Sequence, residues 1–102
     1  MRNKNKNNQR DRPVKRVVKR YIGDIILIYR LFETKEEETY IYSLEIVKVS
    51  LGGTSIEKKY FYDISRSRKE GEQVFNTFSR ALVPPCTASE ILGDILGAFI
   101  PE

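Results

Sequence analysis

Histidine is absent from this chain of 102 residues, and cysteine occurs once, at Cys86. A lone cysteine cannot close a disulfide within the chain, so the class of small secreted proteins held together by disulfides is excluded. The same two counts exclude a Cys/His zinc cluster within one chain and any nucleophile activated by histidine. Only carboxylate, lysine or tyrosine chemistry remains open to it.

Long apolar segments are also missing. The longest unbroken apolar run extends from Ile25 to Tyr29, far short of the roughly 20 residues that a membrane-spanning helix needs. The N-terminus begins with polar and basic residues, and no apolar stretch of the signal-peptide type follows it. These absences predict a protein that does not cross a membrane and remains in the cytoplasm.

Charge and hydrophobicity are divided unevenly along the chain. Residues 1–20 hold nine Lys/Arg and one Asp, a net charge of +8, whereas residues 21–102 hold nine Lys/Arg and thirteen Asp/Glu, a net charge of −4. Only four of the 41 hydrophobic residues fall in the first twenty. We therefore predict a basic, largely disordered N-terminal arm over residues 1–20 and a single small domain over residues 21–102.

The end of the arm, residues 13–20, differs from the polar residues before it. Val14, Val17 and Val18 have the i, i+3, i+4 spacing of one basic amphipathic helical turn. The same β-branched residues also suit a backward extension of the strand that follows. The sequence leaves both alternatives open.

Three later segments have the composition and alternation of β-strands: residues 21–33, 39–51 and 55–64. The acidic run over residues 34–38 and the pair Gly52-Gly53 supply the turns between them. Apolar residues occupy both parities of the first segment, which predicts a strand that is central or covered on both faces.

The loop after the second strand sets which residues face each other. A two-residue glycine loop would place Lys59 opposite Ile46 and interrupt the apolar face of the sheet. A three-residue loop through Thr54 would place Tyr60 opposite Ile46 and keep that face unbroken. We favour the three-residue loop.

Two helices are predicted after the strands. Each begins at a capping box, Ser67-x-x-Glu70 and Thr87-x-x-Glu90, and each ends before proline. Apolar residues at helical spacing follow: Val74, Phe75, Phe78 and Leu82 in the first helix, then Ile91, Leu92, Ile95, Leu96 and Phe99 in the second. The order predicts an α+β fold, in which a three-stranded antiparallel meander is followed by two helices packed on one of its faces.

Several spacings together resemble a known family: Tyr29-x-Leu31, Tyr42-x-Leu44-Glu45-Ile46, Asp63-Ile64-Ser65 and Asp94-Ile95-Leu96. They resemble short uncharacterised proteins, with a domain of unknown function, from Gram-positive, clostridia-like bacteria. The resemblance extends over about residues 27–97, and Ser43 stands where the pattern has glycine. It implies the fold and brings no catalytic residues with it.

Carboxylates on neighbouring strands are the candidates for acid/base chemistry. The favoured register brings no two of Glu45, Glu57 and Asp63 close together. The segment Gly52–Thr54 is not followed by the Lys-Ser/Thr of a phosphate-binding loop. We therefore predict that the protein is not an enzyme and has no catalytic, cofactor-binding or metal-binding residues.

Tyrosine and cysteine each allow two interpretations. All six tyrosines lie between Tyr21 and Tyr62, where they would either stack nucleic-acid bases or pack on a half-buried sheet. We favour packing. Cys86 would be either a reactive thiol at a helix start or a small buried residue in the turn between the helices, and we favour the buried residue.

The favoured function is a non-enzymatic protein-interaction or regulatory module that acts on an unidentified protein partner. The alternative is a nucleic-acid-associating protein whose arm makes weak, non-specific phosphate contacts. A further alternative is that the arm docks on the acidic run Glu36–Glu38 of its own domain. The candidate polyanion-binding residues are Arg10, Arg12, Lys15, Arg16, Lys19 and Arg20.

Overall fold

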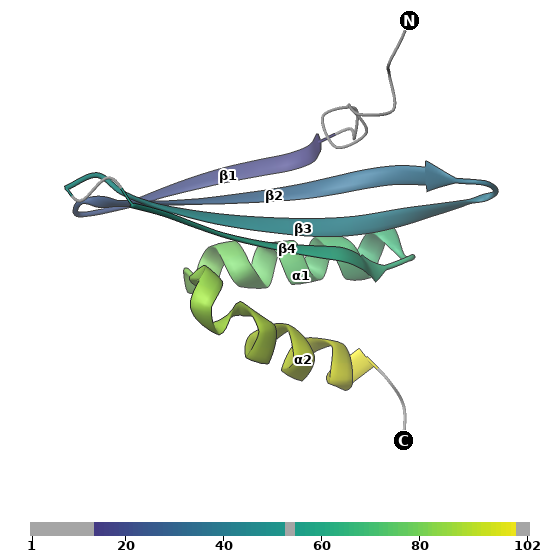
Figure 1. The fold of residues 1–102 in the computed structure, drawn as a ribbon. Helices are drawn as coiled ribbons and strands as arrows, with labels where there is room; N and C mark the ends of the chain where they lie inside the picture. Colours follow the sequence, from purple (N-terminus) through teal and green to yellow (C-terminus); the bar gives the residue numbers. More distant parts are fainter. Residues whose placement is uncertain (1–13, 53–54, 100–102) are drawn as a thin grey trace, which may run out of the picture.

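The computed structural model describes residues 14–52 and 55–99, which form a four-stranded antiparallel sheet and two α-helices (Figure 1). Across the sheet the strands follow chain order: β1 (Val14–Ile22), β2 (Ile25–Glu36), β3 (Thr39–Ser50) and β4 (Ser55–Ser65). Helix α1 (Arg68–Ala81), the short 3-10 helix η2 (Pro85–Thr87) and helix α2 (Ala88–Phe99) lie on one side of it. The predicted α+β class, with an antiparallel meander followed by two helices on one face, is confirmed.

The sheet has one strand more than the sequence analysis predicted. Strand β1 takes residues 14–20 from the segment predicted as a disordered arm and joins them to Tyr21 and Ile22, which were predicted to begin the next strand. Gly23 and Asp24 make the two-residue turn to β2, and Gly23 has φ +57°, a conformation that glycine adopts without strain. The helical turn is thereby excluded for residues 14–20, while the prediction of disorder for residues 1–13 lies outside the described residues.

The favoured register between β3 and β4 is wrong. Ile46 pairs with Lys59, and Leu44 pairs with Phe61, as a two-residue loop requires. Because β4 is at the edge of the sheet, Lys59 remains exposed, and its ammonium group lies 5.8 Å from the centre of the Phe61 ring. A lysine is tolerated at this position because its stem can cover an apolar neighbour while its charge stays in water.

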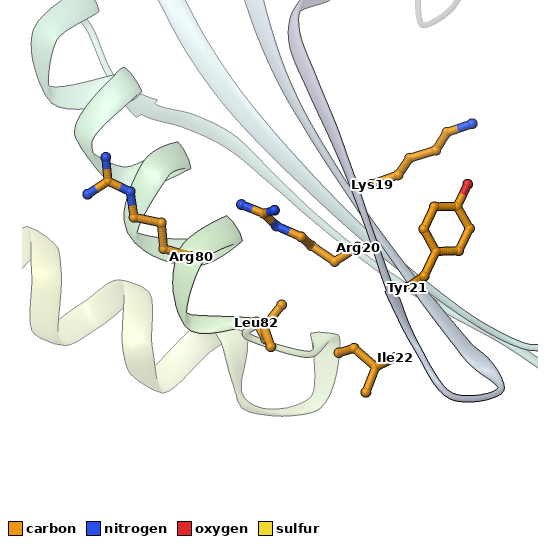
Figure 2. Close-up of a pocket in the computed structure, with 6 residues that line it drawn as sticks. All are labelled: Lys19, Arg20, Tyr21, Ile22, Arg80 and Leu82. Carbon is orange, nitrogen blue, oxygen red and sulfur yellow. The ribbon is translucent and has the colours of Figure 1, made fainter.

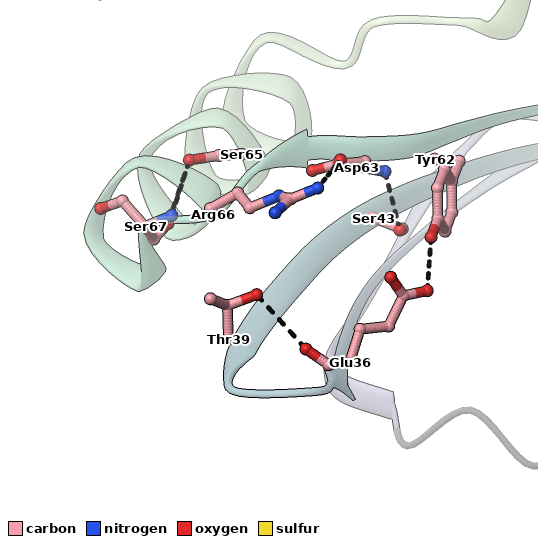
Figure 3. Close-up of polar contacts among 8 residues, drawn as sticks. All are labelled: Glu36, Thr39, Ser43, Tyr62, Asp63, Ser65, Arg66 and Ser67. Atoms are coloured by element: carbon pink, nitrogen blue, oxygen red, sulfur yellow. Dashed lines mark hydrogen bonds and ion pairs between the residues drawn. The ribbon is translucent and has the colours of Figure 1, made fainter.

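Strand β4 bends towards the helices at a bulge. The pairing shifts between Leu44 and Tyr42, so that Tyr42 pairs with Ser65. Asp63 has φ +58°, and its backbone N–H donates a hydrogen bond of 3.1 Å to the hydroxyl of Ser43 (Figure 3). The buried Ser43 side chain therefore holds the extra residues of the bulge, after which the chain enters α1.

Helix α1 begins at the predicted capping box, with one addition. The backbone N–H of Glu70 donates to the Ser67 hydroxyl at 3.3 Å. The backbone N–H of Ser67 donates to the hydroxyl of Ser65 at 2.9 Å, and that hydroxyl bonds to the Glu70 carboxylate at 3.0 Å. In place of a direct bond from the Ser67 N–H to the Glu70 carboxylate, the Ser65 hydroxyl bridges the two. Three side chains therefore satisfy the backbone groups at the start of the helix.

One hydrophobic core lies between the sheet and the helices. Its largest fully buried members are Tyr29, Leu31, Leu44, Ile46, Val74, Phe75 and Phe78. Helix α1 approaches the sheet closely at Gly71, where a Cβ atom would lie 3.0 Å from the Cβ of Tyr42. Leu82 was predicted to belong to the buried stripe of α1, but it is 39% exposed. It is the left-handed residue that ends the helix, so its side chain leaves the stripe.

The opposite face of the sheet carries no helix (Figure 1). Phe32, Ile41 and Val47 are nevertheless buried there, and the rings of Phe32 and Tyr60 meet edge to face with their centres 6.1 Å apart. Tyr29 lies in the core on the helix side. The tyrosines are thus divided between the two faces. Tyr29 and Tyr42 are packing residues of the core, whereas Tyr21, Tyr40 and Tyr62 are exposed.

Candidate functional site

Strand β1 extends beyond the part of the sheet that the helices cover. Helix α1 packs on β2, β3 and β4, and β1 is the strand farthest from it (Figure 1). Two long side chains on the helix side of β1 cross this distance. The guanidinium of Arg16 lies 3.5 Å from the Glu72 carboxylate and 5.0 Å from the centre of the Phe75 ring, and Nε of Arg20 donates to the Ser79 carbonyl at 3.3 Å. Two of the candidate polyanion-binding residues therefore fasten β1 to α1.

Lys15 belongs to a cluster around the carboxylate of Glu33. Its ammonium group lies 3.8 Å from Glu33, which also accepts a hydrogen bond of 2.6 Å from the Tyr42 hydroxyl and lies 3.5 Å from the Arg68 guanidinium. The Tyr42 hydrogen bond, with the charges of Lys15 and Arg68, holds the pKa of Glu33 below its ordinary value. Lys15 is thus engaged within the domain.

Replacing Glu33 by Gln should change how stability depends on pH. Because the pKa of Glu33 is lower in the folded chain than in the unfolded chain, its carboxylate stabilises the fold above the ordinary carboxyl pKa. That stabilisation is lost as the pH falls through the folded pKa. The urea midpoint of the wild-type protein should therefore fall relative to that of Glu33→Gln as the pH is lowered from about 5 to 3.

The matched control for this measurement is Glu38→Gln, which changes an exposed turn carboxylate. Its urea midpoint should follow that of the wild-type protein over the same pH range. If the urea midpoints of the wild-type protein and Glu33→Gln change with pH in parallel, the cluster around Glu33 does not form.

The remaining candidates have different positions. Lys19 is exposed on the side of β1 opposite Arg20 (Figure 2), while Arg10 and Arg12 lie outside the described residues. The structure places Arg20 on the same side of β1 as the last turn of α1, which carries Arg80. The sequence analysis missed Arg80, although a basic residue just before a helix end is a recognisable signal.

A hollow of about 560 Å³, wide open to solvent and called the cavity below, lies between β1 and the end of α1 (Figure 2). Its lining residues are Lys19, Arg20, Tyr21, Ile22, Arg80 and Leu82. Arg20 and Ile22 point from β1 towards α1, and Leu82 lies across from Ile22. Arg20 and Arg80, with no acidic side chain, therefore flank apolar surface contributed by two elements, while the Lys19 side chain points away from it.

Leu82 enters the lining through an unusual backbone conformation. It has φ 58° and ψ 45°, and its N–H closes the helix by donating to the carbonyl of Phe78. Glycine is the common residue at such a helix end, because a side chain there costs roughly 1–2 kcal/mol. Here a leucine keeps the position, and the result is an exposed apolar side chain beside the cavity.

Two of the three carboxylates considered for catalysis pair with arginines, and the third, Glu57, is exposed on β4. Glu45 bonds to Arg30 at 2.6 Å, and Asp63 lies 3.2 Å from Arg66. Over residues 14–52 and 55–99, no three His, Cys, Asp or Glu side chains lie close enough together to hold a metal ion. Cys86 was predicted to be buried, but it is exposed, because it lies on η2 between the two helices.

In the described part of the chain, no helix is long and apolar enough to cross a membrane. Neither a search of curated proteins nor a search of solved structures found a match. Residues 12–98 match a family model described as a family of unknown function, DUF6514, and this span includes every strand and nearly all of α2. The chain therefore belongs to the DUF6514 family.

Proposed function

We propose that the protein is a non-enzymatic interaction module of the cytoplasm, which binds a partner protein along β1. The strand lies at one edge of the sheet, and among the described residues no strand pairs with its outer side. Such an edge presents backbone N–H and C=O groups that an extended peptide can pair with. From Arg16 to Ile22 the pairing of β1 with β2 is regular, so seven consecutive residues offer a continuous edge.

The observation that carries the proposal is the cavity beside this edge. Strand pairing alone gives affinity with little selectivity, and selectivity comes from pockets that take alternate side chains of the added strand. The cavity at Arg20 and Ile22 is in the place where an added strand would put such side chains. The edge and the pocket together form a peptide-binding arrangement.

Non-specific binding of nucleic acid is less well supported. Four of the six candidate cations are described, and two of them, Lys15 and Arg16, form ion pairs with glutamates of the same domain. Phosphate binding by either residue would first have to break its ion pair. The other two described candidates, Lys19 and Arg20, lie beside apolar side chains.

A selection from a random peptide library on the full-length protein tests the proposal. Enriched peptides should bind one to one, and their amide NMR titrations should shift the signals of residues 16–22 more than those of β4. No enrichment, or shifts confined to β4 and the helices, would overturn the proposal. A titration with a single-stranded DNA of about 20 nucleotides tests the alternative of non-specific nucleic-acid binding, for which the affinity should fall steeply as salt is raised.

A further inference from the structure

The cavity beside β1 has charge of one sign. Arg20 and Arg80 supply positive charge to its lining, which contains no acidic side chain, and Lys19 adds a third charge on the opposite side of β1. The Arg20 guanidinium is held by the bond from Nε to the Ser79 carbonyl, which leaves its two terminal nitrogens for another acceptor. An oriented guanidinium of this kind suits a carboxylate, because its N–H groups match the two carboxylate oxygens.

The same cavity also exposes apolar side chains. Ile22 is 42% exposed and Leu82 is 39% exposed, and they come from opposite walls (Figure 2). A ligand that removes both from water gains from the hydrophobic effect. A phosphodiester backbone carries no group that covers such surface, and the flat bases stack on aromatic rings and not on branched side chains such as Ile22 and Leu82. A peptide carries both acidic and branched apolar side chains. The combination therefore favours a peptide over a nucleic acid.

The spacing along β1 fixes the order of side chains that would fit. Arg20 and Ile22 point to the helix side, and Lys19 and Tyr21 point to the other side (Figure 2). In a strand added beside β1, residues opposite each other point to the same face. Two neighbouring acidic residues would thus lie opposite Lys19 and Arg20, and the next two residues, opposite Tyr21 and Ile22, would be apolar.

Resting on the proposed function, we infer that the partner is an acidic, extended peptide in which a pair of Asp or Glu residues adjoins a pair of apolar residues. It pairs with β1 and binds one carboxylate to Lys19 on one side of the strand and the other to Arg20 and Arg80 on the helix side. An apolar side chain of the peptide covers Ile22 and Leu82. This site would explain why leucine occupies a helix end that glycine would fit better, since the leucine side chain contacts the peptide.

Three labelled ten-residue peptides test this inference by fluorescence anisotropy with the full-length protein. One has the acidic pair beside the apolar pair, the second has Asn and Gln in place of the acids, and the third has the same residues in scrambled order. The first should bind about tenfold more tightly than either other peptide, since it alone makes the charged hydrogen bonds in register. Its advantage over the uncharged peptide should shrink as salt is raised.

Two variants and a matched control locate the binding site. Arg80→Ala should weaken binding of the first peptide about tenfold, whereas Arg66→Ala, which removes an exposed arginine paired with Asp63, should leave it unchanged. Leu82→Gly separates binding from folding. It should raise the free energy of unfolding by relieving the left-handed backbone, and it should still lower the affinity for the peptide.

Failure of this inference is distinguishable from failure of the proposed function. If the library selection gives peptides that shift the signals of β1 but lack acids, or that bind Arg80→Ala as well as the wild type, the acidic peptide is overturned and the interaction module stands. If no peptide binds at β1, both are overturned. If single-stranded DNA binds and Arg80→Ala weakens it, the site takes phosphate instead of a peptide carboxylate.

Discussion

Replacing Phe78 by Ala should lower the free energy of unfolding by about 3–5 kcal/mol. Phe78 is fully buried in the core between α1 and the sheet, where its ring is among the largest side chains without solvent contact. Truncation loses the transfer free energy of the ring and leaves a cavity that the surrounding side chains fill only in part. Urea unfolding, followed by circular dichroism, measures the change.

The matched control is Ile56→Ala on β4, where the side chain is 67% exposed. Its effect should stay within about 0.5 kcal/mol, because the isoleucine buries little surface. A loss below about 1 kcal/mol for Phe78→Ala would mean that α1 does not present this face to the sheet. The end of α1, with Arg80 and Leu82, would then not be placed beside β1 either.

The helices and most of the core could be predicted from the sequence, because their signals are local. Val74, Phe75 and Phe78 recur at the helical period, and Ser67 and Glu70 mark the start of α1 three residues apart. Such patterns are set by the geometry of one element and survive whatever the rest of the chain does. They were enough for the fold class.

Strand β1 was not predicted as a separate strand, although strand conformation for its residues was one of the two alternatives left open. Its helix side lacks the continuous apolar pattern that would have decided between them. Its inward positions include Arg16 and Arg20, which a pattern of apolar and polar residues assigns to a solvated segment. The strand overhangs α1, so long basic side chains span the distance and find Glu72, Phe75 and the end of the helix. Arginine, which is usually exposed, can face the helix side here because, among the described residues, no helix lies directly beneath β1.

The register of β4 was wrong for a related reason. The sequence analysis assumed that the apolar face of the sheet continues across every strand, which holds for central strands only. At the edge, Lys59 can occupy an inward-facing position and still reach water. An unbroken apolar face was therefore too strong a requirement to choose between the two loops.

The candidate site depends on tertiary structure that no local pattern contains. Lys19 and Arg20 were selected for their charge, but Arg80 and Leu82 come from the far end of α1. The left-handed conformation of Leu82 could not be predicted, because glycine or asparagine is the usual signal for it. Only the packing of α1 beneath the sheet brings these residues to β1.

A buried hydrogen bond fixes this end of α1 to the sheet. The hydroxyl of Tyr29, on β2, donates a buried hydrogen bond of 3.0 Å to the carbonyl of Val83, the residue after Leu82. Tyr29→Phe should lower the free energy of unfolding by about 1–3 kcal/mol, because it leaves that carbonyl buried without this donor. Urea unfolding at neutral pH measures the loss.

The pH dependence of the same variant checks that the hydroxyl is the cause. Burial, opposed in part by the charge of Arg20, raises the pKa of Tyr29 from 10.0 to about 12. A raised pKa means that the neutral phenol stabilises the fold fully below about pH 10, and that this contribution is lost as the pH rises towards about 12. The wild-type protein should therefore lose its advantage over Tyr29→Phe across that window, while tyrosines present in both proteins affect both curves alike. An advantage that stays constant up to pH 12 would place the Tyr29 hydroxyl in water and would leave the end of α1 without this link to β2.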